Sequence, residues 1–157
     1  TLISKVSSTV SFPYWNVPKS IVIDEFVKDF IRDPNFGIKN RFELITDSGK
    51  VLDVYSINWK HVTNKNFRYT LRQVPGCDNS LGVLKFYFES PYDIYMHDTD
   101  AHYLFGRASR HKSHGCIRLE KPLELAEFLM PNSSLLDKKA MQILKESNKH
   151  FIVSKYE

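Results

Sequence analysis

Apolar residues follow two different spacings along this chain, and these spacings predict where strands and helices lie. Alternation of apolar and polar positions, which is typical of half-buried strands, dominates the first half and the middle of the sequence. The predicted strands are 6–12, the two arms of a hairpin with a Gly-containing turn at 47–50, 67–74, 83–89 and 94–96, which leads directly to His97.

The clearest helix is predicted between Ser20, which can cap it, and the pair Pro34 and Gly37, which end it. Its apolar residues recur at helical spacing on one face: Ile23, Phe26, Val27, Phe30 and Ile31. Two further helices are predicted near the end of the chain, at 121–130 with Pro122 in a first-turn position and at 135–147, before a final strand at 151–155. This mixed order predicts an α+β fold.

Length and composition indicate one globular domain, residues 1–157, with a proper core, because 42% of the residues are hydrophobic and 25% are charged. Lys and Arg total 22 against 18 for Asp and Glu, and the excess is spread along the chain, so we expect no nucleic-acid partner. No apolar run approaches the ~20 residues of a membrane span. The chain starts at Thr1 without an initiator Met, so we expect any targeting segment or membrane anchor to lie upstream.

Chemically suggestive residues gather in one segment, 96–119. It contains one of the two cysteines, Cys116, and four of the six histidines: His97, His102, His111 and His114. It ends in the hexapeptide Ser-His-Gly-Cys-Ile-Arg at 113–118. Three interpretations fit such a cluster: a metal cage, a thiol nucleophile with a histidine base, or a polar loop without chemistry.

The thiol interpretation assigns a chemical role to several residues of this segment. An unperturbed thiol is only about 3% ionised at pH 7, so a nucleophilic Cys116 needs a base, and His97 and His114 are both candidates. Gly115 permits a turn in which its own amide and that of Cys116 point at one oxyanion. Arg118 lies on the same face as Cys116 if the segment is extended, where it can clamp a carboxylate; the alternative is a solvated surface arginine.

The metal interpretation is weaker, because the spacing of these histidines and Cys116 matches none of the common zinc templates. We therefore expect neither a metal nor an organic cofactor. His102 and His111 have polar and charged neighbours and are interpreted as surface imidazoles outside the site. Cys77 lies in the turn-rich stretch 75–82, and we expect it and Cys116 to be free thiols, since a disulfide needs a Cα separation that neighbouring loops seldom have.

The sequence His-Asp-Thr after an apolar and aromatic strand, followed by Ser-His-Gly-Cys-Ile-Arg, resembles the L,D-transpeptidase catalytic domain, also called YkuD-type. Three other stretches, Tyr-Trp-Asn-Val-Pro at 14–18, Arg-Gln-Val-Pro-Gly at 72–76 and Asn-Ser-Leu-Gly at 79–82, are similar to larger envelope-anchored members that carry an inserted lid. The resemblance covers about residues 6–130. It implies a mixed, β-rich sheet with a helical and hairpin lid at about 21–72, and edge strands missing at both ends.

The resemblance also implies residue roles. Cys116 would be the nucleophile and His97 the general base, its ring oriented by a neighbouring backbone carbonyl, with His114 as the second candidate base. The remaining roles would fall to His114 and Gly115 with Ser113 for the turn and oxyanion site, and to Arg118 and Asp98 for contacts with substrate.

The implied activity is a cysteine-dependent acyl transfer that cross-links peptidoglycan stem peptides through a thioester and releases D-alanine. The resemblance implies an envelope or periplasmic location, and it implies inhibition by carbapenem-type compounds. Two alternatives remain open at this point. A cysteine L,D-carboxypeptidase would use water as the acceptor on the same stem peptides, and a catalytically silent module would only bind peptidoglycan.

Overall fold

The computed structural model describes residues 3–110, 113–131 and 151–155 of the chain. The chain divides into two compact units, one formed by Thr1–Pro13 with Pro75–Glu157 and the other by Tyr14–Val74. Helices occur with two sheets, in agreement with the predicted α+β class. The predicted helix at 135–147 and the residue His111 lie outside the described residues.

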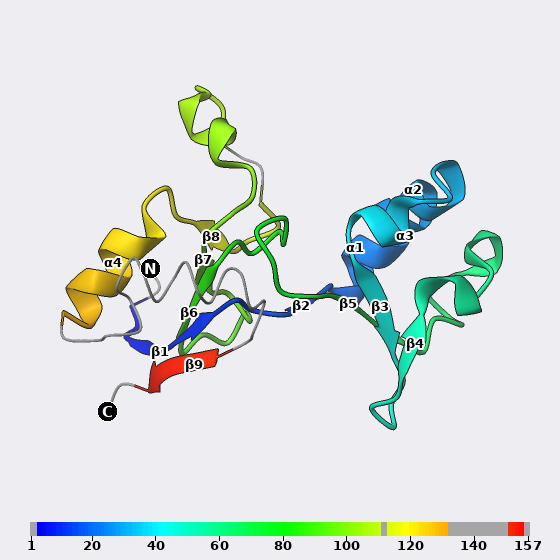
Figure 1. Cartoon of the computed structure of the whole chain (residues 1–157), viewed down its shortest axis with the longest axis horizontal. Helices are drawn as coiled ribbons and strands as arrows, with labels where there is room; N and C mark the ends of the chain where they lie inside the picture. Colours follow the sequence, from blue (N-terminus) through cyan, green and yellow to red (C-terminus); the bar gives the residue numbers. More distant parts are fainter. Residues whose placement is uncertain (1–2, 111–112, 132–150, 156–157) are drawn as a thin grey trace. The chain divides into compact units, whose positions relative to one another are not determined.

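The first unit is built on a five-stranded sheet with the order β8-β7-β6-β1-β9 (Figure 1). Its strands are β1 (Val6–Ser11), β6 (Leu84–Phe88), β7 (Met96–His97), β8 (Ile117–Arg118) and β9 (Phe151–Lys155). Neighbouring strands are antiparallel except β7 and β8, which are parallel. The predicted strands at 6–12, 83–89 and 151–155 and the one leading to His97 are thereby confirmed, with small differences in their bounds.

Helix α4 (Pro122–Leu129) packs on one face of this sheet and has Pro122 at its first position, as predicted. The buried side chains between helix and sheet are Phe12, Leu84, Phe86 and Ala126, with Met96 and Leu119 among the partly buried residues around them. Because side chains alternate across a strand, the residues between these core positions project to the other face. The site is built on that other face.

The second unit contains a four-stranded antiparallel sheet with the order β2-β5-β3-β4. Its strands are β2 (Trp15–Asn16), β3 (Phe42–Ile45), β4 (Val51–Asp53) and β5 (Thr70–Gln73). The predicted hairpin is confirmed, and Gly49 in its turn has a φ of +80°, which favours glycine. The predicted strand at 67–74 is shorter than expected, although Phe67 and Leu71 are buried as its alternation required.

The helical segments of the second unit include one continuous run. It consists of α1 (Lys19–Ile21), a π-helical stretch (Val22–Phe26) and α2 (Val27–Arg32). The other short segments are α3 (Phe36–Lys39) and the 3-10 turns Val54–Ser56 and Trp59–His61. The predicted cap at Ser20 is wrong, because Pro18 is the N-cap and its carbonyl accepts the bond from Val22 N at 3.1 Å. Ser20 therefore lies inside the first turn.

The predicted apolar face of this helix is also partly wrong. Ile31 is 44% exposed, whereas Ile21 and Val22 are buried together with Phe30. A π-helical turn closes its hydrogen bonds over one more residue than an α-helical turn, so the residues before it rotate relative to those after it. A strict 3.6-residue spacing cannot anticipate this rotation, and the buried stripe shifts accordingly.

The core of the second unit is strongly aromatic. Phe30 stacks on Trp59 with ring centroids 3.8 Å apart, and Trp59 Nε1 donates to Val54 O at 2.8 Å. Phe26, Phe36 and Phe42 surround this pair. This unit thus has a core of its own, with aromatic pairs that contribute beyond their buried area.

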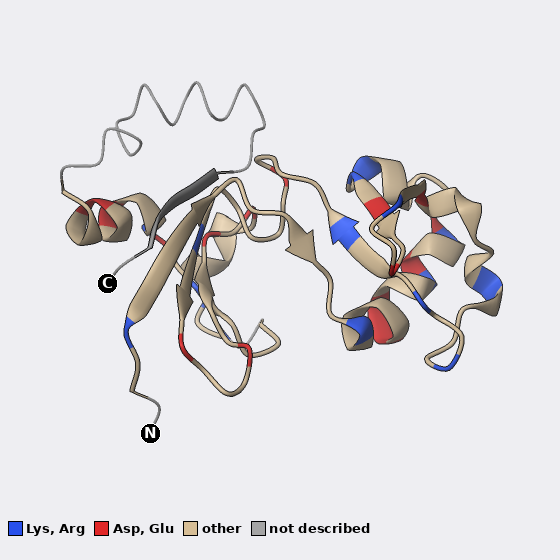
Figure 2. Ribbon diagram, turned by 90° about the horizontal axis from the view of Figure 1, so that it is seen from below, with Lys and Arg blue, Asp and Glu red and all other residues tan. Residues whose placement is uncertain are grey.

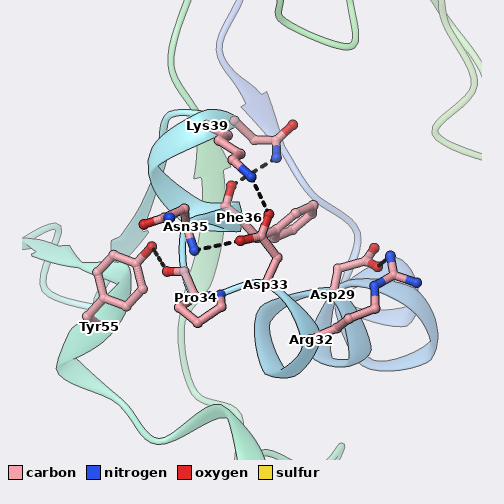
Figure 3. Close-up of polar contacts among 9 residues, drawn as sticks. Asp29, Arg32, Asp33, Pro34, Asn35, Phe36, Lys39 and Tyr55 are labelled. Atoms are coloured by element: carbon pink, nitrogen blue, oxygen red, sulfur yellow. Dashed lines mark hydrogen bonds and ion pairs between the residues drawn. The ribbon is translucent and has the colours of Figure 1, made fainter.

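Polar contacts hold the junction between α2 and α3 (Figure 3). The Asp33 carboxylate accepts from Asn35 N at 2.9 Å and from Lys39 Nζ at 2.7 Å, while Tyr55 Oη donates to Pro34 O at 2.5 Å. The hydrogen bond from Lys39, and after it the one from the Asn35 amide, lower the pKa of Asp33. These bonds fix the direction change after α2 ends.

Charged positions of both signs are interspersed over the helices of the second unit (Figure 2), which fits the modest net charge of +4 for the whole chain. Within the described ranges, no helix has the length and apolar character needed to span a membrane.

Candidate active site

The Cys116 turn precedes strand β8 and opens on a cavity of about 380 Å³. Its lining includes four residues that the sequence singled out: Ser113, Gly115, Cys116 and Arg118. Ala101, Leu104, Phe105, Arg110 and Ile117 complete the lining. Gly115 has a φ of +120°, so the turn that presents the thiol uses a backbone conformation that other residues rarely adopt.

His97 lies on the strand next to that turn. Strands β7 and β8 are parallel with His97 paired to Arg118, and Leu119 N donates to His97 O at 2.8 Å. Met96 belongs to the core beneath α4, so His97 and its strand partner Arg118 project to the opposite face of the sheet. On the other side, Lys85 of β6 pairs with His97 and lies on the same face.

The His97 side chain is held in one orientation. It is 5% exposed, and its Nδ1 forms a hydrogen bond with the carbonyl oxygen of Asp98. A carbonyl oxygen only accepts, so Nδ1 carries the proton and the neutral ring keeps its lone pair on Nε2. The ring thus makes the contact with a neighbouring carbonyl that the resemblance implied.

Burial also sets the charge of this histidine. The pKa of His97 is lowered from 6.5 to about 4, chiefly by desolvation, while the bond to the Asp98 carbonyl opposes this shift. The nearby positive charges of Arg118 and Lys85 lower the pKa further. At neutral pH the imidazole is therefore uncharged, which is the form that accepts a proton.

Lys85 is a component of the site that the sequence reasoning missed. Its side chain is buried, with Nζ 3.7 Å from the ring centroid of Tyr95 and 4.3 Å from that of Tyr87. The Tyr95 ring in turn lies 5.7 Å from the His97 ring. A single lysine inside the apolar and aromatic strand 83–89 was the available signal, because a buried cation needs compensating partners.

Arg118 contains one hydrogen-bond donor that is not used within the part of the protein that the structure describes. Its Nε is buried and has no hydrogen-bond partner among the described residues. Buried donors are nearly always satisfied in folded proteins, so this unpaired Nε–H is unusual. Arg118 is partly buried and lines the cavity, and its role stays a prediction.

Asp98 is buried and has contacts with other parts of the protein. It is 4% exposed, its Oδ2 accepts from Val83 N at 2.9 Å, and its Oδ1 lies 2.9 Å from His102 Nε2. Oδ2 is therefore held by the backbone, whereas the buried Oδ1 has the His102 ring nearby but makes no hydrogen bond among the described residues. It borders a second cavity, of about 470 Å³, that Cys77 and His102 also line.

The remaining histidines of the segment are more exposed than His97. The side chain of His102 is 52% exposed at the start of a 3-10 turn, His102–Gly106, and His114 is exposed in the turn before Cys116. Among the residues that the structure describes, no group of three or more His, Cys, Asp or Glu could hold a metal ion. Both cysteines are free thiols, with Cys77 exposed and Cys116 half-buried.

The positive φ of Gly115 leads us to expect that Gly115→Ala slows the reaction of Cys116. A Cβ added there would meet no atom within 4 Å, so Gly115→Ala changes only the preferred backbone conformation, at a cost of about 1–3 kcal/mol. We expect the turn to relax and the rate of Cys116 acylation to fall on the order of 10-fold. The measurement is the time course of the acyl-enzyme mass. Gly49→Ala, also at positive φ with open space, is the control and should react as wild type.

Fold and site together define an α+β domain with a cysteine turn at the edge of a sheet and a buried histidine on the neighbouring strand. Residues 1–139 match the model of the family described as the L,D-transpeptidase catalytic domain, YkuD, and the chain belongs to this family. A curated protein of Haemophilus influenzae named "Putative L,D-transpeptidase" is 35% identical over 141 residues. The match covers 90% of this chain but only 28% of that relative's length. The resemblance found from the motif is thereby confirmed.

Proposed function

We propose that this chain is the catalytic core of a peptidoglycan L,D-transpeptidase that acts through a thioester on Cys116. The observation that carries the proposal is the cavity at the cysteine turn, which Gly115, Cys116 and Arg118 line together, with the buried, neutral His97 on the adjacent strand. Membership in the YkuD family supports the reaction class.

In the first half-reaction His97 Nε2 accepts the thiol proton of Cys116. The sulfur then forms a bond to the carbonyl carbon that joins the third residue of a tetrapeptide stem to its terminal D-alanine. Amide groups of Gly115 and Cys116 stabilise the oxyanion of the tetrahedral intermediate. The C–N bond breaks, and D-alanine leaves with the proton that His97 carries.

In the second half-reaction an amine on the side chain of a neighbouring stem attacks the thioester. His97 takes a proton from the attacking amine, the C–S bond breaks, and the proton returns to the sulfur. The products are a peptide cross-link and regenerated Cys116. These steps balance without any added co-reactant.

Arg118 is proposed to bind the free carboxylate of the substrate, because it lines the cavity and a guanidinium can form two parallel hydrogen bonds with a carboxylate. Ser113 and His114 are proposed to support the turn rather than to move protons. The compact insertion Tyr14–Val74 contains the whole of 21–72, and we propose that it serves as the lid of this family's larger members. The corresponding location is the cell envelope, and carbapenem-type compounds are the expected inhibitors.

The test is incubation of the purified chain with a stem tetrapeptide, followed by intact-mass measurement and product analysis. We expect a mass gain equal to the tripeptide acyl group, release of D-alanine, and a cross-linked dimer when an amine acceptor is present. Free tripeptide without dimer would identify a carboxypeptidase instead. The absence of any acyl adduct, with tetrapeptide or with a carbapenem, would contradict the proposal.

A further inference from the structure

We propose that the side chain of Asp98 is a positioning residue for His97. It fixes the peptide group whose carbonyl orients the imidazole, and it does so together with the turn at 79–82. The inference deepens the proposed function and rests on it for the activity readout, although the ring orientation of His97 can be measured independently.

Asp98 forms two hydrogen bonds with the start of strand β6 and the residue before it. Its backbone N donates to Leu84 O at 2.9 Å, and its carboxylate Oδ2 accepts from Val83 N at 2.9 Å. With 4% of the residue exposed, these bonds form away from water, where they are stronger. Main chain and side chain of Asp98 are thus both fixed, which leaves its carbonyl a single direction toward His97 Nδ1.

Gly82 leaves room for this carboxylate because it has no side chain. A Cβ at Gly82 would lie 2.3 Å from Asp98 Oδ2 and 2.6 Å from Asp98 Cβ, and Gly82 also has a φ of +59°. Both facts require glycine. This close approach shows that the turn and the Asp98 side chain are in tight van der Waals contact.

Hydrogen bonds of Asn79 support that turn. Asn79 is fully buried; its Oδ1 accepts from Leu81 N at 2.8 Å and its Nδ2 donates to Pro13 O at 3.2 Å. Gly82 N closes the turn by donating to Asn79 O at 2.7 Å. The Asn-Ser-Leu-Gly stretch therefore has a structural purpose in the site: it presents Val83 N and the open Gly82 position to Asp98.

His102 contributes the least to this arrangement. Its Nε2 is 2.9 Å from Asp98 Oδ1, but its side chain is 52% exposed, so water and salt screen the pair. The buried bond from Val83 N is the one that holds Asp98. We accordingly expect His102→Ala to react within about three-fold of wild type.

The experiment compares Asp98→Ala with Asp98→Asn. The asparagine carbonyl can still accept from Val83 N, whereas alanine cannot. We expect Asp98→Ala to lose about 10-fold or more in the rate of Cys116 acylation by a tetrapeptide, and Asp98→Asn to recover to within about three-fold of wild type. Asp100→Ala, which removes the exposed neighbouring carboxylate, is the matched control and should behave as wild type.

A second readout separates orientation of His97 from a general loss of stability. The ring ¹⁵N shifts of His97 report which nitrogen carries the proton, and they should show Nδ1–H in wild type, Asp98→Asn and Asp100→Ala. In folded Asp98→Ala the two tautomers should be mixed. An unchanged tautomer and rate in Asp98→Ala would overturn the inference.

Gly82→Ala displaces the Asp98 carboxylate without removing it. It therefore tests the positioning role of Asp98 if Asp98→Ala does not fold. It should reproduce the slow acylation and the mixed tautomer, whereas Gly49→Ala should do neither. If wild type itself forms no acyl-enzyme, the proposed function fails, while the tautomer comparison still judges Asp98. If wild type reacts and none of these variants alters rate or tautomer, the role of Asp98 alone is refuted.

Discussion

Replacement of Cys116 by alanine is expected to abolish the acyl-enzyme completely, because no other group at the cavity can form the thioester. The side chain is half-buried and borders open space, so its removal should leave the fold intact. The measurement is intact mass after incubation with a tetrapeptide or a carbapenem, paired with a thermal unfolding curve for each variant. A Cys116→Ala chain that still gained the acyl mass would show that the nucleophile lies elsewhere.

Cys77 supplies an internal control for this prediction. It is the more exposed of the two thiols, so simple accessibility favours its alkylation over that of Cys116. Preferential alkylation of Cys116 would therefore demonstrate chemical activation by its surroundings. Cys77→Ala should keep both the acyl adduct and the reactivity of Cys116. Equal alkylation of both thiols, together with no adduct, would favour a silent binding module.

The short motif at 113–118 predicted much of the candidate site, because its residues are neighbours in sequence and share one turn. The strand that leads to His97 was also predicted, because the residues before this histidine are apolar and aromatic, and it is confirmed as β7. The contact of the His97 ring with the Asp98 carbonyl came from the family resemblance, since nothing in the alternation of β7 requires it. Local features of this kind are encoded over a few residues.

Features that depend on distant parts of the chain were not predicted. Lys85 reaches the site only because β6 pairs with β7, and pairing between strands cannot be derived from the composition of one strand. The hydrogen bond from Val83 N to Asp98 Oδ2 was likewise not predicted, because it joins segments that are distant in sequence, and a substrate contact of Asp98 stays a prediction. The buried stripe of the helical run at 19–32 shifted for another reason, the π-helical turn, which has no clear sequence signature.

Replacement of His97 by alanine is expected to slow acylation of Cys116 on the order of 10²-fold or more, because the variant lacks the proton acceptor. The rate should be measured with saturating tetrapeptide under single-turnover conditions. His61→Ala, which removes an exposed histidine of the second unit, should retain the wild-type rate. His114→Ala should lose less than His97→Ala if His114 only supports the turn. A larger loss at His114 would transfer the role of base to that residue.

The low pKa of His97 gives this prediction a pH signature. Since burial keeps the ring neutral down to about pH 4, acylation should show no loss attributable to this base between pH 7 and 5.5.

The stability of the fold should behave differently, because in the unfolded chain the same ring takes up a proton near pH 6.5. As the pH falls from 6.5 toward 4, His97 becomes protonated in the unfolded state but stays neutral in the folded state. The free energy of unfolding therefore decreases by on the order of 3 kcal/mol. Urea unfolding at several pH values should show this loss in wild type, and His97→Gln should lack that part of it. Identical pH dependence in the two proteins would mean that His97 titrates normally in the folded state and that Lys85, Arg118 and burial do not hold it neutral.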